Sequence, residues 1–147
     1  MKIALASDHA GLDLRQELVR FVRDLGHEAV DLGTESGASC DYPDYAKTAA
    51  RSLAAGEVDR AILVCGTGQG VAMTANRFAG VRCCVCTETF SARMSRAHND
   101  ANALAMGAWV VGTGLAQEIV RVWLDAAFDG GRHTGRVAKI DAGEIPE

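Results

Sequence analysis

Short apolar runs that alternate with stretches of helical period constrain the fold of this 147-residue chain more than any other feature. The apolar runs lie at residues 2–7, 28–33, 60–66 and 81–86, with a fifth at 103–107 or 108–112. The helix-like stretches cover residues 11–26, 43–56, 68–78, 88–98 and 115–128. The apolar runs do not alternate apolar with polar residues, which is typical of parallel strands buried on both faces. The sequence therefore predicts a single-domain, three-layer α/β/α sandwich with a five-stranded parallel sheet, a Rossmann-like arrangement.

Length, charge and cysteine content limit the classes of protein to which the chain can belong. A chain of this length can bury a continuous core without disulfides or a structural metal. The net charge is −4 and the Lys and Arg residues are scattered, so we expect neither a nucleic acid nor a membrane as partner. The N-terminal apolar run is too short for a secretion signal, which predicts a cytoplasmic protein. Five cysteines without a paired CxxC or Cys/His zinc spacing predict reduced thiols and no metal site.

The C-terminal segment, residues 130–147, is more polar than the rest of the chain. It predicts a helix at about residues 132–143 that leaves the globule or packs on a partner subunit. We therefore expect residues 1–147 to form one domain with a helical extension.

Polar and reactive side chains follow three of the predicted strands. Asp8 and His9 follow the first, Tyr42 lies in the connection after the second, and Cys65 ends the third. In an open parallel sheet, ligands bind outside the carboxyl ends of the strands, where loops lead into helices. We therefore expect these three connections to converge on one site.

The third of these connections, CGTGQG at residues 65–70, combines a thiol with three glycines. Gly66, Gly68 and Gly70 allow a tight loop whose N–H groups point inward, and the start of the next helix adds positive potential, so the loop can bind an anion or an oxyanion. The pattern is neither the dinucleotide fingerprint nor a P-loop. Some thiolate character is expected for Cys65 at such a position, which would allow it to act as a base.

A purely structural interpretation of the same residues is also possible. Cysteine is a common small buried residue and glycine turns often follow strands, so Cys65 and its loop could serve packing alone. We expect that role for Cys83, Cys84 and Cys86, which fill a predicted strand. Histidine is favourable at the end of a helix, and arginines four residues apart can form a solvated helix face; these interpretations apply to His98 and to Arg132 and Arg136.

Blocks spread along nearly the whole chain match one known pattern: ASDHAG at 6–11, DYPDYA at 41–46, CGTGQG at 65–70 with ANRFAG at 75–80, SRAHNDANALAMG at 95–107 and GGRHTGRV at 130–137. In this order they resemble ribose-5-phosphate isomerase type B. The wider ribose/galactose isomerase family also includes galactose-6-phosphate and allose-6-phosphate isomerases. Together the blocks are far more specific than any one of them.

The resemblance implies an aldose–ketose isomerase that interconverts ribose 5-phosphate and ribulose 5-phosphate through a cis-enediol or enediolate, without metal or cofactor. It implies that Cys65 takes the proton from C2 of the open-chain aldose. The amides of residues 66–70, which include Gln69, would hold the oxyanion, and Thr67 would move protons between O1 and O2. His98 would open the sugar ring, and Asp8 would assist.

The resemblance also implies how the substrate is held. Tyr42 and Asn99 would contact the sugar, whereas Arg132, Arg136 and His9 would bind the phosphate. It further implies a homodimer, or a tetramer of paired dimers, in which His98 and Asn99 reach the cleft of the other subunit.

The chain departs from the family pattern at one position. Many relatives carry an arginine of the phosphate site after LAMG, whereas this chain has Trp109. Trp109 is therefore a candidate determinant of specificity, and an isomerase of allose 6-phosphate, galactose 6-phosphate or a tetrose phosphate is an alternative. An alternative from another class is a flavodoxin-like binding module without catalysis.

Overall fold

The structure, a computed structural model, describes residues 1–142. Five parallel strands form one sheet in the order β2-β1-β3-β5-β4. Their bounds are β1 (Lys2–Ser7), β2 (Glu28–Asp31), β3 (Arg60–Cys65), β4 (Cys83–Val85) and β5 (Ala103–Gly107). The helices are α1 (Leu12–Asp24), α2 (Tyr42–Ala54), α3 (Gln69–Ala75), α4 (Thr89–Asn99), α5 (Thr113–Asp125) and α6 (Arg132–Asp141), and a short 3₁₀ turn, η1 (His9–Gly11), precedes α1. The predicted α/β fold with a five-stranded parallel sheet is confirmed.

Element boundaries differ from the prediction in a few places. Of the two candidates for the fifth strand, 103–107 is the strand, while 108–112 forms a turn in which the N–H of Trp109 donates to the carbonyl of Gly66 at 3.0 Å. The third helix ends at Ala75 rather than at residue 78, because the chain turns there and the Asn76 side chain bonds the start of β4. The fourth strand is only three residues long.

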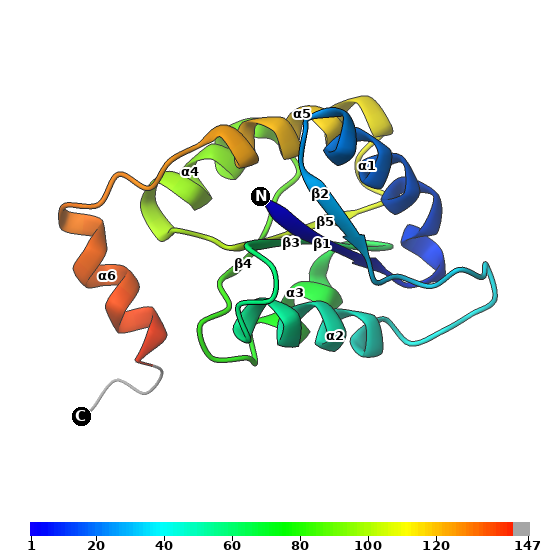
Figure 1. Cartoon of the computed structure of the whole chain (residues 1–147), viewed down its shortest axis with the longest axis horizontal. Coiled ribbons are helices and arrows are strands. Elements are labelled where there is room, and N and C mark those ends of the chain that lie inside the picture. The colour runs from blue at the N-terminus through cyan, green and yellow to red at the C-terminus, as the bar shows by residue number, and fades with distance from the viewer. Residues whose placement is uncertain (143–147) are drawn as a thin grey trace.

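The two faces of the sheet are covered by different helices and by side chains of different size. Helices α1, α4 and α5 lie on one face, and α2 and α3 on the other (Figure 1). The first face is lined by large strand residues, which are Ile3, Leu5, Ile62, Val64, Leu104 and Met106. The second face is lined mainly by small ones, which are Ala4, Ala6, Ala61, Ala103, Ala105 and Cys65, with Leu63 among them. The strands thus alternate by side-chain volume rather than by polarity, because both faces are apolar.

The connections after β1 and β3 leave the sheet toward opposite faces. The chain after β1 enters η1 and α1 on the first face, and the chain after β3 enters α3 on the second. The two strands are neighbours, with Ser7 paired to Val64 at their carboxyl ends. Divergent connections from adjacent strands open a crevice, which is the usual ligand site in sheets of this kind.

Helix α6 stands away from the body of the molecule (Figure 1). It packs against α4, and its last residue, Asp141, accepts two hydrogen bonds of 2.9 Å from Arg82. The predicted helix at 132–143 is therefore present over Arg132–Asp141, and residue 143 lies outside the described residues. No helix within residues 1–142 is long and apolar enough to cross a membrane.

Candidate active site

Cys65 lies at the carboxyl end of β3 with only 5% of its surface exposed. The N–H of Gly68 donates a hydrogen bond to its Sγ at 3.1 Å. Gly68 adopts a left-handed conformation (φ +81°), and a Cβ there would stand 2.8 Å from the Met106 carbonyl carbon, so glycine is required. An N–H directed at sulfur stabilises negative charge on it. The backbone of the loop therefore directs a hydrogen-bond donor at this thiol.

Two aromatic rings lie against the glycine loop. A Cβ on Gly66 would stand 2.6 Å from the Trp109 ring, and one on Gly70 would stand 2.5 Å from the Tyr42 ring. Trp109 is 75% exposed and Tyr42 is 40% exposed, so both rings also face solvent. The absence of side chains at these two glycines lets the aromatic rings approach the backbone and border the space beside the loop.

The polar residues of the loop, Thr67 and Gln69, are exposed. The N–H of Gln69 donates to Thr67 Oγ1 at 3.4 Å. The backbone of Thr67 rests on Gly107 at the end of β5, where a Cβ would be 2.7 Å from Thr67 Cα. The loop is thus supported from beneath by the neighbouring strand while its polar side chains remain accessible.

Asp8 and His9 stand at the carboxyl end of β1. Asp8 is buried, and its Oδ1 accepts the N–H of Gly11, which caps η1. His9 Nδ1 accepts the N–H of Cys40 at 3.2 Å. Because a backbone N–H can only donate, neutral His9 carries its proton on Nε2, and this N–H can donate to a ligand. Sequence reasoning missed Cys40, which no local pattern connects to His9.

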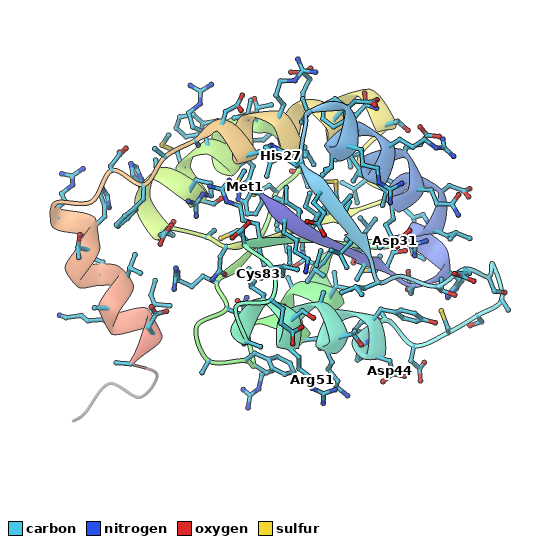
Figure 2. All side chains as sticks on the ribbon, in the orientation of Figure 1. Met1, His27, Asp31, Asp44, Arg51 and Cys83 are labelled. Atoms are coloured by element: carbon cyan, nitrogen blue, oxygen red, sulfur yellow. The ribbon has the colours of Figure 1, made fainter. Side chains whose placement is uncertain are left out.

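A buried guanidinium, that of Arg15, bonds to residues at the carboxyl ends of β1 and β2. Arg15, 1% exposed, donates to Ser7 Oγ at 3.2 Å and to the Thr34 carbonyl at 2.8 Å, and its Nε lies 3.0 Å from Asp31 Oδ1. The Nε contact has the distance but not the direction of a hydrogen bond. Asp31 is labelled in Figure 2, at the end of β2. Arg15 therefore joins the ends of β1 and β2 just behind Asp8.

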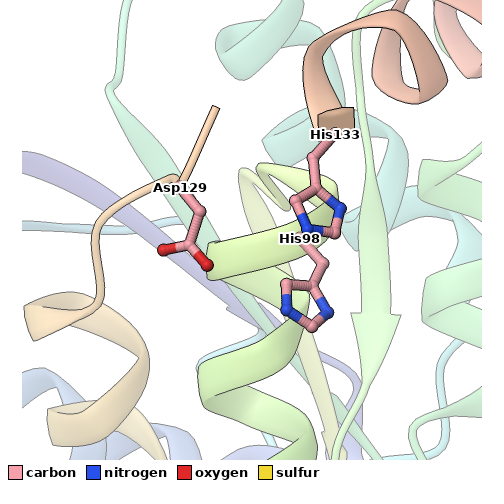
Figure 3. Close-up of side chains that lie close together, drawn as sticks. All are labelled: His98, Asp129 and His133. Carbon is pink, nitrogen blue, oxygen red and sulfur yellow. The ribbon is translucent and has the colours of Figure 1, made fainter. Parts of the chain in front are cut away.

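The remaining predicted residues form a second group. His98 lies in the last turn of α4, and its ring stacks on His133 of α6 with centroids 4.3 Å apart and planes at 6° (Figure 3). Burial lowers the pKa of His133, and the charges of His98, Arg132 and Arg136 lower it further, whereas Asp129 raises it. The predicted sugar ligand Asn99 and the predicted phosphate ligands Arg132 and Arg136 are exposed.

The three cysteines near β4 differ from Cys65. Burial raises the pKa of the Cys86 thiol to about 12, and it also raises the pKa values of Cys83 and Cys84. These thiols remain protonated at neutral pH, as expected for residues that fill a strand.

The family of the chain follows from comparison with known proteins. The model of the Ribose/Galactose Isomerase family matches residues 3–140. The chain belongs to this family. Ribose-5-phosphate isomerase B of Escherichia coli (strain K12) is 50% identical over 141 residues, which cover 96% of this chain and 95% of that protein. D-erythrulose-4-phosphate isomerase of Pectobacterium atrosepticum is 38% identical over 141 residues, which cover 95% of this chain and 93% of that protein.

Solved structures agree with this assignment. Ribose-5-phosphate isomerase B of Clostridium thermocellum superposes with a TM-score of 0.95 at 49% identity, covering 97% of this chain and 96% of that one. The predicted family and the predicted enzyme class, an isomerase, are confirmed.

A single subunit does not bring all the predicted site residues together. Asp8, His9, Tyr42, Trp109 and the loop at residues 65–70 gather where β1 and β3 end. Helix α4 instead ends three residues before β5 begins, so His98 lies at the amino edge of the sheet. At about 3.3 Å per residue, the six residues of β3 separate the two edges by roughly 20 Å.

A hollow of about 740 Å³ lies between α6 and residues 76–84. Its wall includes Asn99 but not Cys65, so it belongs to the second group.

Proposed function

We propose that this member of the family interconverts ribose 5-phosphate and ribulose 5-phosphate by proton transfer, with Cys65 as the base. The observation that carries the proposal is the hydrogen bond from the Gly68 N–H to Cys65 Sγ, which stabilises a thiolate at the crevice between β1 and β3. The E. coli relative at 50% identity is named for the same reaction.

The proposed chemistry uses the sulfur and the loop amides in sequence. Cys65 Sγ takes the proton from C2 of the open-chain aldose, and the electron pair of that C–H bond forms the C1–C2 double bond of an enediolate. The charge that develops on O1 is stabilised by N–H groups of the loop, a contribution of about 3–4 kcal/mol for a well-placed donor. Thr67 moves a proton from O2 to O1, and Cys65 returns its proton to C1 to give the ketose.

A second copy of the chain completes the proposed site. His98 opens the sugar ring and Asn99 binds the substrate, yet both lie at the opposite sheet edge from Cys65 in their own chain. Their role therefore requires the crevice of a partner, and the protruding α6 is the element that extends toward it. The proposal is a homodimer with two shared sites, in which a lone subunit is inactive.

The proposed phosphate site combines both groups. Arg132 and Arg136, one helical turn apart on α6, supply guanidinium groups, and His9 of the other chain donates from Nε2. Tyr42 contacts the sugar hydroxyls beside Gly70, and Asp8 assists ring opening. Neither a metal nor a cofactor takes part in these steps, so chelators are expected to leave turnover unchanged.

The two directions of the reaction test this assignment. Ribose 5-phosphate is mainly a closed furanose, whereas ribulose 5-phosphate cannot close a furanose ring because its O5 is esterified. His98→Asn should therefore slow turnover of ribose 5-phosphate strongly while sparing turnover of ribulose 5-phosphate. If His98→Asn slowed turnover of both substrates equally, His98 would not be the residue that opens the ring.

Incorporation of solvent deuterium tests the proton-transfer chemistry itself. Label should enter C2 of the aldose or C1 of the ketose, because a thiol proton exchanges with solvent. Turnover without any label would indicate a hydride shift and would reject Cys65 as the base.

Trp109 favours a second candidate substrate class. The indole lies over Gly66, beside the loop, and supplies an apolar surface rather than a cation. The relative at 38% identity is named for a four-carbon sugar phosphate. A comparison of kcat/KM on pentose, tetrose and hexose phosphates decides between them, and family membership favours any of these over a flavodoxin-like binding module.

A further inference from the structure

Three potential metal ligands from distant parts of the sequence meet beside α6. They are His98 at the end of α4, Asp129 in the connection before α6, and His133 in the first turn of α6 (Figure 3). One ligand atom of each lies within 4.8 Å of the other two. No spacing rule of the sequence reveals this cluster, because the fold alone brings His98 to the other two.

The backbone holds the three residues in place. The N–H of Asp129 donates to the Ala97 carbonyl at 2.9 Å, which fixes the connection to the end of α4 next to His98. The N–H of His133 donates to the Gly130 carbonyl at 3.0 Å, which fixes the start of α6. The cluster is therefore a feature of the packing of α6 rather than a chance meeting of surface side chains.

The ligand atoms of this cluster stand somewhat farther apart than those of an occupied metal site. In a tetrahedral zinc site with bonds of 2.0–2.1 Å, ligand atoms stand about 3.3 Å apart. Because the two imidazole planes are almost parallel, at 6° and 4.3 Å between centroids, their in-plane lone pairs do not converge on one ion until a ring rotates. The χ2 torsion of histidine is soft, so such a rotation costs little.

The ligand types select the metal. Two imidazoles and one carboxylate suit Zn²⁺ and similar divalent transition metals, and they do not suit Mg²⁺ or Ca²⁺, which take oxygen ligands. Arg132 and Arg136 are close enough to act on the charge of His133, and their repulsion opposes a cation. The site is thus suited to reversible binding rather than to a permanently held metal.

We propose that His98, Asp129 and His133 bind Zn²⁺ reversibly and that the bound ion inhibits the isomerase. The inhibitory part rests on the proposed function, because a nitrogen of His98 that ligates a metal cannot transfer the proton that opens the sugar ring. Binding itself requires only the cluster.

Calorimetric titration of the full chain with Zn²⁺ tests the binding. Asp129→Ala removes an exposed ligand and should weaken the affinity by about tenfold or more, since loss of even an outer contact of a metal ligand costs 10- to 100-fold. Asp125→Ala, the loss of an equally exposed carboxylate four residues earlier, is the matched control and should not change it. If the two variants bind Zn²⁺ with equal affinity, the proposal is overturned, because the ion must then be bound at another site, such as the cysteine thiols.

Inhibition in each direction of the reaction separates the two proposals. Zn²⁺ on His98 should inhibit turnover of ribose 5-phosphate at least tenfold more than turnover of ribulose 5-phosphate, and Asp129→Ala should relieve this inhibition while keeping normal activity without zinc. Equal inhibition in both directions overturns the proposal and indicates binding to Cys65. If His98→Asn does not show the directional loss, the ring-opening role fails, but the calorimetric result still decides whether the cluster binds metal.

Discussion

Cys65 and the cysteines of β4 place the same thiol in two environments. Cys65 and Cys86 are both buried; Cys65 is the last residue of β3, and Cys86 directly follows β4. The N–H of Gly68 donates to Cys65 Sγ, whereas burial dominates at Cys86 although a hydrogen bond with the Ser95 side chain opposes it. Burial alone therefore does not distinguish the proposed base from the cysteines near β4. The difference is the N–H directed at Cys65 Sγ, which depends on a glycine in the left-handed conformation.

The largest expected effect is on the rate of alkylation, which should be far lower for Cys83 and Cys86 than for an ordinary exposed thiol. With the Cys86 pKa near 12, the thiolate at pH 8 is about 10³-fold rarer than for an ordinary thiol with a pKa of about 8.5. Native protein treated with iodoacetamide should carry no label on Cys83 or Cys86, as read by peptide mass spectrometry. Half-exposed Cys40 serves as the internal control. Native labelling of Cys86 at the rate of Cys40 would contradict the comparison.

Removal of each sulfur gives the next largest effect. Cys65→Ala should lower kcat by about 10² or more through loss of the general base, with the fold retained. Cys86→Ala should leave kcat within a factor of about two. Steady-state kinetics with circular dichroism of both variants checks this, and near-normal activity of Cys65→Ala would reject the base.

The amide can be displaced without touching the sulfur. Gly68→Ala forces a side chain into the left-handed region and against Met106, a strain of about 1–2 kcal/mol before the clash is counted. We expect kcat to fall about tenfold because the N–H moves away from Cys65. Gly114→Ala, where no atom lies within 4 Å of the added Cβ, is the control. If both variants retain full activity, the amide does not prepare the thiol.

The smallest expected effect is on stability. Cys83→Ala leaves a small cavity and should lower the free energy of unfolding by about 1 kcal/mol, measured by urea denaturation. Cys40→Ala, at a partly exposed loop position, should change it by less than about 0.5 kcal/mol. An unchanged stability for Cys83→Ala would show that the β4 thiols do not contribute to packing.

Much of this arrangement could be predicted from local sequence. Apolar runs located all five strands. In β1, β3 and β5 burial on both faces leaves an unbroken apolar pattern, whereas the edge strand β2 is only partly buried. The alternation of large and small residues in KIALAS also indicates which face of the sheet carries the larger side chains, although polarity alone conceals it. The loop at Cys65 was predictable because its residues are contiguous.

Contacts between distant segments could not be predicted in this way. The support of His9 by Cys40 and the meeting of Asp129 with His98 depend on how separate connections pack, and no local pattern encodes them. The position of His98 at the opposite sheet edge follows from the direction of α4, which becomes evident only once the strand order is fixed.

The alanine-lined face of the sheet has a consequence for how the protein tolerates change. Alanines leave no side-chain volume that can be redistributed, so an enlarged residue at Ala4 or Ala105 must push α2 or α3 outward as a rigid body. Because α3 begins at Gln69, that displacement reaches the loop at Cys65 directly. Bulky residues on the other side, such as Leu5 and Met106, can repack among themselves. Among strand residues, substitutions that preserve turnover should therefore be more frequent on the face covered by α1, α4 and α5 than on the face covered by α2 and α3.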